Sequence, residues 1–166
     1  MRIVADIIVA AAEGDLSAGL DELNESMRSL GWYPAGSVAP PYCREWSSGD
    51  QRVHLVDEGD SWFVDLTFRE LMPEGVDEFG YVAVEEETAR QIPISRMILD
   101  ELLSTLEGRV SLSPAPKTYF GDIDFVEAWS WEISGHPFVM GVSAMDIDTP
   151  VLVMARMGLA PASDDE

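Results

Sequence analysis

The chain has 166 residues, of which 46% are hydrophobic and 25% are charged, a composition typical of one globular domain. Aspartate and glutamate number 31 against 10 lysines and arginines, and the resulting net charge of −21 argues against binding nucleic acid or an anionic membrane surface. No apolar stretch approaches the roughly 20 residues of a spanning helix, and a single cysteine, Cys43, excludes an internal disulfide framework.

The first predicted element is the apolar segment 1–12, which has the outline of a signal peptide. Asp6 interrupts its apolar run, and only six uncharged residues follow before Glu13. A cleavable signal needs an uninterrupted apolar stretch of about 7–15 residues. We therefore interpret the segment as an element of the fold and expect the protein to be cytoplasmic.

A helix is predicted over 16–30, because apolar residues recur there at spacings of three and four. The stripe consists of Leu16, Leu20, Leu23, Met27 and Leu30. Asp15 suits the N-cap position of this helix, and Gly31 suits the position that ends it.

Beyond residue 42 the hydrophobic pattern changes to a period of two, which predicts strands over 42–47, 51–57 and 61–69 joined by tight turns. In the third strand, alternation places Trp62, Val64, Leu66 and Phe68 on one face and Phe63, Asp65, Thr67 and Arg69 on the other. This alternation is typical of a sheet with one buried face and one face largely in water.

The second half of the chain again mixes helix and strand. A turn-rich joint over 71–79 leads to a strand over 80–86 and then to a second helix over 95–107, whose apolar residues lie at helical spacing. The remaining predicted elements are a loop over 111–116, strands over 123–133, 137–144 and 150–157, and a disordered acidic tail over 160–166.

Short sequence matches indicate that the two halves are related. Leu-Asp-Glu-Leu occurs at 20–23 and again at 99–102, and Ser-Gly occurs at 48–49 and again at 134–135. The predicted order of one strand, one helix and three strands also appears in both halves, with segment 1–12 as the leading strand of the first. A duplicated β-α-β-β-β unit accounts for these observations.

We therefore predict an α+β fold in which two helices pack on one face of a curved, mostly antiparallel sheet. The domain is expected to cover 1–159, with related halves over about 1–72 and 80–158.

Neither histidine belongs to a catalytic or metal-binding sequence motif. His54 alternates with Val53 and Leu55 along its strand, and His136 lies in the turn that follows the strand over 123–133. We interpret both histidines as structural residues. Cys43 is interpreted as a small buried apolar side chain rather than a nucleophile.

Two pairs of aspartates, Asp122 with Asp124 and Asp146 with Asp148, have the spacing that places both side chains on one side of an extended chain. Their oxygen atoms suit Ca²⁺ or Mg²⁺, but neither pair has the glycine turn and closing glutamate of a calcium loop. The chain also lacks a glycine-rich phosphate loop. We predict no specific metal site, no cofactor and no enzymatic activity.

An aromatic pair, Trp129 and Trp131, lies on one face of the strand over 123–133, together with Phe125 and Glu127. We interpret the pair as core residues beneath a helix. The alternative is an exposed aromatic pair bordered by acids, which is typical of a protein-binding hot spot. In that case acidic runs that we expect to be loops would attract a basic partner.

The charge leads to the main function hypothesis, a non-enzymatic acidic protein that binds a basic protein partner. Such a protein could be an immunity-type inhibitor of a toxin, nuclease or nucleic-acid-binding enzyme, or a chaperone. The predicted contact residues are Asp57, Glu58, Asp60, Glu85, Glu86, Glu87, Trp129 and Trp131.

Three alternatives stay open. The protein could bind a small ligand or act as an enzyme through a pocket between helices and sheet, using His54, His136 or an aspartate pair. The acidity could instead serve only solubility or life at high salt. A homodimer formed through a sheet edge is also compatible with the sequence.

Overall fold

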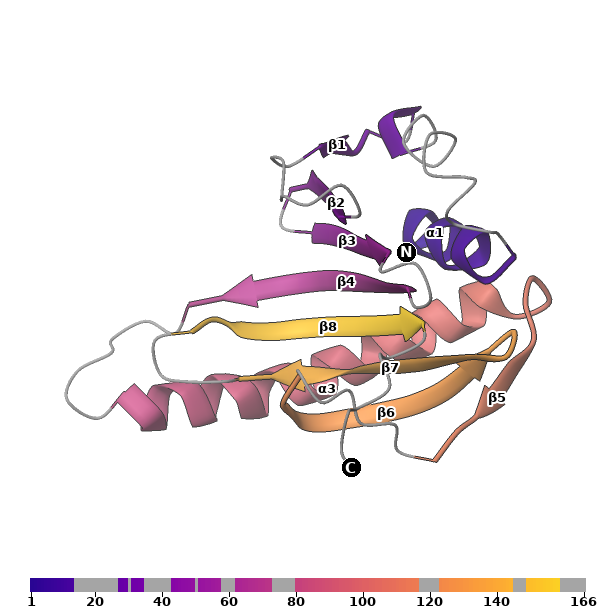
Figure 1. Cartoon of the computed structure of the whole chain (residues 1–166). Coiled ribbons are helices and arrows are strands. Elements are labelled where there is room, and N and C mark those ends of the chain that lie inside the picture. Colours follow the sequence, from indigo (N-terminus) through magenta and orange to yellow (C-terminus); the bar gives the residue numbers. More distant parts are fainter. Residues whose placement is uncertain are drawn as a thin grey trace, which may run out of the picture.

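The computed structural model describes residues 1–13, 27–29, 31–34, 43–49, 51–57, 62–72, 80–116, 123–144 and 149–158. Within these residues, helices α1 (Arg2–Glu13) and α3 (Gly80–Leu106) pack on one face of an antiparallel sheet of eight strands (Figure 1). The predicted α+β class, with helices on one face of an antiparallel sheet, is confirmed.

The sheet has the strand order β1-β2-β3-β4-β8-β7-β6-β5. The strands are β1 (Tyr33–Pro34), β2 (Cys43–Ser48), β3 (Gln51–Asp57), β4 (Trp62–Leu71), β5 (Leu112–Pro114), β6 (Phe125–Ile133), β7 (His136–Ser143) and β8 (Val151–Gly158). Two runs of four sequential strands therefore meet side by side where β4 pairs with β8. Six predicted strands, the three over 42–69 and the three over 123–157, are present within about two residues of their expected limits.

The predicted β-α-β-β-β repeat is wrong in its leading strands. Segments 1–12 and 80–86 are helical, in α1 and α3, and each half instead ends in four strands because β1 and β5 are added. The repeated Ser-Gly pairs do occupy matching places, Ser48-Gly49 between β2 and β3 and Ser134-Gly135 between β6 and β7. Descent of the halves from one unit stays a prediction, as do the domain limits.

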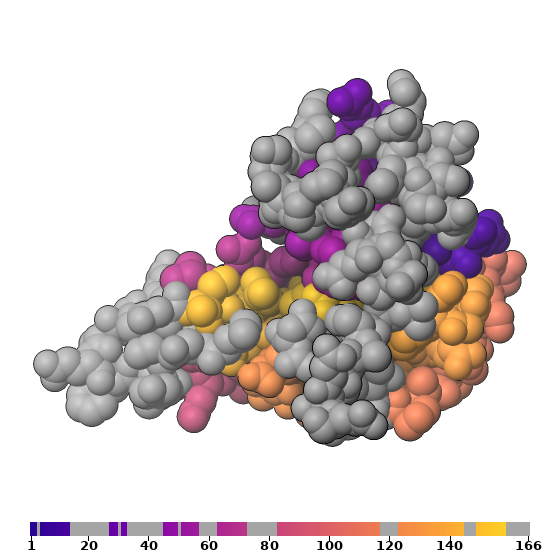
Figure 2. Space-filling model, viewed as in Figure 1, coloured from indigo at the N-terminus to yellow at the C-terminus, as the bar shows by residue number. Residues whose placement is uncertain are grey.

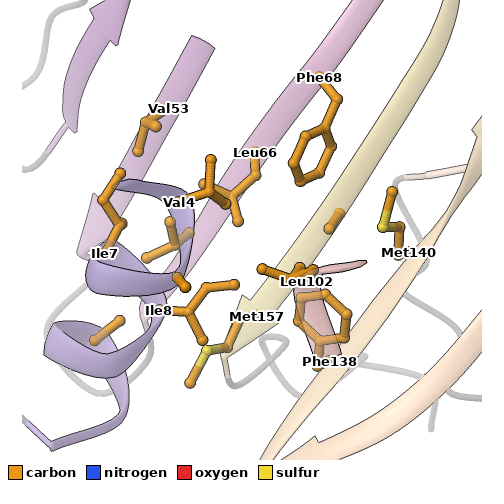
Figure 3. Close-up of a cluster of buried hydrophobic side chains, with 14 of the residues drawn as sticks. Val4, Ile7, Ile8, Val53, Leu66, Phe68, Leu102, Phe138, Met140 and Met157 are labelled. Atoms are coloured by element: carbon orange, nitrogen blue, oxygen red, sulfur yellow. The ribbon is translucent and has the colours of Figure 1, made fainter. Parts of the chain in front are cut away.

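Helix α1 forms because its apolar residues recur at helical rather than alternating spacing. Val4, Ile7, Ile8 and Ala11 are at most 4% exposed and face the sheet and α3. Figure 3 shows Val4 beside Leu66 of β4, Ile7 toward Val53 of β3 and Ile8 beside Met157 of β8. Leu102 and Phe138 lie on the far side of the same cluster.

Helix α3 begins fifteen residues before the predicted helix over 95–107, at Gly80, and continues through Pro93. Its buried stripe consists of Val84, Thr88, Gln91, Ser95, Leu99, Leu102 and Leu106. The first half of this stripe is partly polar, so apolar periodicity reveals only the second half. Helical residues over 80–86, predicted as a strand, keep the same face buried through Val84.

The segment 111–116, predicted as a loop, contains the short strand β5. Leu112 pairs with Ile133 and Pro114 with Trp131, so β5 forms one edge of the sheet. Proline at a strand end is tolerated on an edge, where its missing N–H removes no ladder hydrogen bond.

Register shifts overturn two predicted side-chain directions. Between Thr67 and Arg69 the register of β4 shifts against β8, and the Arg69 guanidinium donates a hydrogen bond of 2.8 Å to Gln91 on α3. Arg69 therefore lies on the helix-covered side rather than the opposite one. A second shift in β6 separates Phe125 from Glu127, and Phe125 packs over Gly141 on the face away from the helices.

Two predictions concern residues outside the described part of the chain. The helix over 16–30 is described only at residues 27–29, which are helical, and the acidic tail 160–166 is not described. In the described residues, neither helix combines the length and the apolar character that crossing a bilayer requires.

Candidate partner-binding surface

One side of α3, continued by the residue directly after its end, runs along β6 and carries two acidic residues, two apolar residues and one arginine. Positions 85, 92, 96, 103 and 107 are separated by seven, four, seven and four residues, so they share one side of the helix. These residues are Glu85, Ile92, Arg96, Leu103 and Glu107. The tryptophans of β6 lie beside this side of α3.

Trp129 and Trp131 face the helix-covered side of the sheet. Each pairs with a buried core residue of β7, Trp129 with Met140 and Trp131 with Phe138. Both indoles pack against the hydrophobic core, yet both are only half-buried. The structure therefore combines the two readings of the sequence, since the pair contributes to the core and also reaches the surface.

Arg96 covers Trp129. Its guanidinium carbon lies 5.4 Å from the centroid of the Trp129 ring, a cation–π distance. Its Nε also lies 3.2 Å from Oδ1 of Asp100, one turn later on α3. The positive charge of Arg96 is thus held between an aromatic face and a carboxylate.

Trp131 lies in an open groove of about 370 Å³, which we call the tryptophan groove. Its lining residues are Leu103, Ser104, Glu107, Gly108, Val110, Leu112 and Trp131. The walls come from the last turn of α3, the connection that follows it, β5 and β6. Four of the lining side chains are apolar and half-buried, and Glu107 is the one charged residue among them.

The acidic run Glu85–Glu87, expected as a loop, lies on the helix α3 and does not form one patch. Successive residues of a helix point about 100° apart, so the three carboxylates diverge. Glu85 and Glu86 are exposed, and Glu86 lies 3.4 Å from Arg90. Glu87 is more buried, accepts a hydrogen bond from Gln91, and lies 3.3 Å from Arg90.

The structure does not place the other predicted contact residues on this surface. Asp57 ends β3, where its backbone pairs with Trp62 of β4, on a different part of the sheet from α3 and β6. Glu58 and Asp60 lie outside the described residues. Of the six predicted contact residues that the structure describes, only Glu85, Trp129 and Trp131 share the side between α3 and β6.

A polar row missed by sequence reasoning crosses the face of the sheet away from the helices. Strand register aligns Glu45 of β2, His54 of β3, Asp65 of β4 and Arg156 of β8. Arg156 is 4% exposed and binds Asp65 through two hydrogen bonds, of 2.6 Å from Nε and 2.7 Å from Nη2. Figure 2 views the molecule from this face, where atoms of the N-terminal strands (magenta), of β8 (yellow) and of the β6–β7 hairpin (orange) can be seen.

Alternation along each strand places Asp65 and His54 on this face, but the pairing with Arg156 depends on which strand lies beside β4. That neighbour is β8, which is far from β4 in sequence. The guanidinium also stacks on Phe63, with its carbon 4.0 Å from the ring centroid. The row is therefore a tertiary feature without a local sequence signal.

The two histidines lie on opposite faces of the sheet, His136 having the same alternation as the core residues Phe138 and Met140 of β7. His54 lies on the face opposite the helices, between Glu45 and Asp65 in strand register. His136 begins β7 and pairs with Ile133, rather than lying in the turn as predicted. The side chain of Cys43, at the start of β2, is outside the described part.

The described residues contain no group of three histidine, cysteine, aspartate or glutamate side chains placed to hold a metal ion. Asp124 is exposed directly before β6, and its partner Asp122 lies outside these residues, as do Asp146 and Asp148.

A second hollow, of about 500 Å³, lies where α1 meets the C-terminal half of α3. It is lined by Met1, Arg2, Asp6, Glu101, Thr105 and Arg109. Charges of both signs border it, and Asp6 and Arg109 form an ion pair with each other. This hollow therefore does not favour a ligand of one charge, whereas the tryptophan groove, with Glu107 as its charged residue, favours a cation.

No protein-family model matches the chain, and comparisons with curated proteins and with solved structures likewise gave no match.

Proposed function

We propose that the protein is a non-enzymatic acidic binding protein that engages a basic protein partner through α3 and the neighbouring part of β6. The observation that carries the proposal is the excess of exposed carboxylates on α3 and directly after it, which point to more than one side of the helix. These are Glu85, Glu86, Asp100, Glu101 and Glu107.

The arginines of α3 do not neutralise this excess of carboxylates. Arg90 and Arg96 are both largely exposed and each is already next to a carboxylate on the same helix, at 3.3–3.4 Å and 3.2 Å. Over residues 80–109, three exposed arginines, with Arg109 as the third, stand against these five exposed carboxylates. Arg109 is paired with Asp6 of α1. Exposed ion pairs of this kind contribute little to stability, about 1 kcal/mol or less, so their loss to a partner costs little.

A net charge of −21 also repels itself within one small domain. A basic partner would relieve this repulsion and would be attracted over a longer range, which raises the rate of association. The partner classes that fit are a basic toxin, nuclease or nucleic-acid-binding enzyme for an inhibitor, and a basic effector for a chaperone. In each case carboxylates would occupy a surface that otherwise meets phosphates.

The first test is capture of the partner from a lysate of the native host, followed by measurement with the purified pair. We expect one basic protein to bind at low salt and to be released at high salt, because exposed charges are screened within about 10 Å at 0.1 M salt. A bait that retains no basic protein at either salt concentration would contradict the proposal.

The second test reverses charges on α3. Glu85→Lys with Glu86→Lys should weaken binding of the purified partner about tenfold or more, a change of about 1.4 kcal/mol. Glu87 is left unchanged because it bonds Gln91. The matched control, Glu13→Lys with Glu132→Lys, makes the same change in net charge at exposed positions of α1 and β6. Equal weakening by both double variants would show that net charge, rather than α3, determines binding.

A further inference from the structure

We infer that the tryptophan groove receives a large apolar side chain of the basic partner, and that a lysine or arginine adjacent to it in the partner lies against Glu107. This inference rests on the proposed function and names the segment of the partner that the surface recognises. It concerns the C-terminal end of α3, whereas the charge-reversal test concerns its first turns.

The apolar half of the recognised segment follows from the walls of the groove. Leu103, Val110, Leu112 and Trp131 are half-buried, so each leaves apolar surface in contact with water. The open volume of about 370 Å³ is large enough for a large side chain. Tryptophan in a concave, partly desolvated setting is the residue type that most often dominates binding energy at protein interfaces.

The basic half follows from the charges beside those walls. Glu107 is exposed at the groove, and none of the described residues that line the groove is basic. Helix α3 ends here, at Leu106, and carries no basic residue in its last turn. The C-terminal end of a helix has a partial negative charge that favours cations. Carboxylate and helix end therefore attract a positive charge to the same place.

Arg96 gives the bound segment a direction. It stacks on Trp129 and pairs with Asp100, so the positive charge lies at the Trp129 side, away from Glu107. Because Arg96 offsets the charge of Asp100, the Trp129 side attracts a basic residue of the partner less than the Glu107 side does. Trp131 is consequently the aromatic residue that is open to an incoming apolar side chain.

The probes are three short capped peptides of equal length, one in which arginine alternates with leucine, one with arginine and serine, and one with glutamate and leucine. Each carries a fluorescent label, and its affinity for the full chain is measured by anisotropy at low salt. We expect the arginine–leucine peptide to bind at least about tenfold more tightly than either of the others, because only it supplies both an apolar contact and a cation.

Two variants locate the binding. Glu107→Lys should weaken the arginine–leucine peptide about tenfold, whereas Glu132→Lys, with the same change in charge at an exposed position on the other face of β6, should weaken it about twofold or less. Ser104→Phe, at an exposed position on the groove wall, should block the arginine–leucine peptide and leave the arginine–serine peptide unchanged. Circular dichroism melting curves confirm that each variant is folded.

Each outcome bears on one claim. Equal binding of the two arginine peptides, or equal effects of Glu107→Lys and Glu132→Lys, would overturn the groove as the site while leaving an acidic protein with a basic partner. Equal binding of the arginine–leucine and glutamate–leucine peptides would overturn the charge selection. If no peptide binds but a basic protein is captured from the lysate, the groove inference fails and the proposed function stands.

Discussion

Arg156 is buried on the face of the sheet away from the helices, and its guanidinium meets both carboxylate oxygens of Asp65. A paired, two-point contact of this kind is the geometry in which a buried guanidinium is tolerated. The Arg52–Glu70 pair, at 3.0 Å, links neighbouring strands of the same sheet but is much more exposed. The two pairs therefore have similar distances and very different consequences for stability.

Asp65→Ala should lower the free energy of unfolding by about 3–5 kcal/mol, because it removes the carboxylate from a buried arginine. The exposed control Glu70→Ala should cost about 1 kcal/mol or less. Chemical denaturation of both variants measures the difference. Replacing both partners, Asp65→Leu with Arg156→Met, should recover much of the loss, since it leaves no buried charge. A small effect of Asp65→Ala would contradict the importance of this pair.

The face to which a side chain points could be predicted where strand alternation alone determines it. Alternation along β4 correctly placed Val64, Leu66 and Phe68 in the core. It failed for Arg69, because a bulge adds one residue and reverses the sides of the strand beyond it. The Arg96–Trp129 contact could not be predicted at all, since it depends on how α3 lies against β6.

At the scale of the elements, the strands were more predictable than the helices. Hairpin strands alternate in hydrophobicity and are separated by turn residues, such as Ser134 and Gly135, both of which have positive φ angles, 50° and 85°. Helix α3 was recognised only where its stripe is leucine-rich. Its first half buries Thr88, Gln91 and Ser95, each at most 5% exposed, and this polar stripe carries no apolar signal.

Pro93 stands in the middle of α3 with its side chain exposed, so packing does not require it. Proline in a helix interior removes one backbone hydrogen bond and clashes with the preceding turn. Pro93→Ala should therefore raise the free energy of unfolding, by about 1–3 kcal/mol. Thermal and denaturant melting curves test this, with Ala89 on the same helix as the site of a control, Ala89→Ser, which should change stability by less than about 1 kcal/mol. Destabilisation by Pro93→Ala would show that packing on the sheet needs a bent α3.

The candidate site was predicted only in part, because some of its residues stand in local sequence patterns and others meet only in the folded protein. The sequence identified Trp129, Trp131 and the acidic residues around Glu85 as components, because each is visible as a residue type in a local pattern. It could not indicate that Leu103, Glu107 and Leu112 would form a groove with Trp131, since three separate elements build it. The sequence prediction also treated the acids of 85–87 as one patch, whereas in a helix their side chains point in different directions.

At the scale of the whole molecule, the sheet is built so that its two runs of four strands are joined at its centre. Strands β4 and β8 pair over eight positions, and β4 lies in the first run of four strands while β8 ends the second. Helix α3 contacts β7 and β8, and α1 contacts α3. The surface between α3 and β6 therefore rests on an extensively paired sheet, which keeps the groove walls in fixed positions.

The net charge of −21 has a consequence for stability that does not depend on any partner. Like charges repel in the compact state, and salt weakens this repulsion by shortening the screening length from about 30 Å at 0.01 M to about 8 Å at 0.15 M. The melting temperature of the isolated protein should therefore rise with sodium chloride over this range. The rise should level off at higher concentration, because screening is then nearly complete.

Calorimetry in a sodium chloride series tests this, with sucrose as an uncharged control for general solvent effects. A protein whose acidity serves only life at high salt should continue to gain stability well beyond about 0.5 M, where screening alone adds little. Levelling at moderate salt, together with a partner that binds at low salt, would instead indicate that the repulsion is relieved by binding. A melting temperature that is constant over the low-salt range would contradict the idea that repulsion among the carboxylates limits stability.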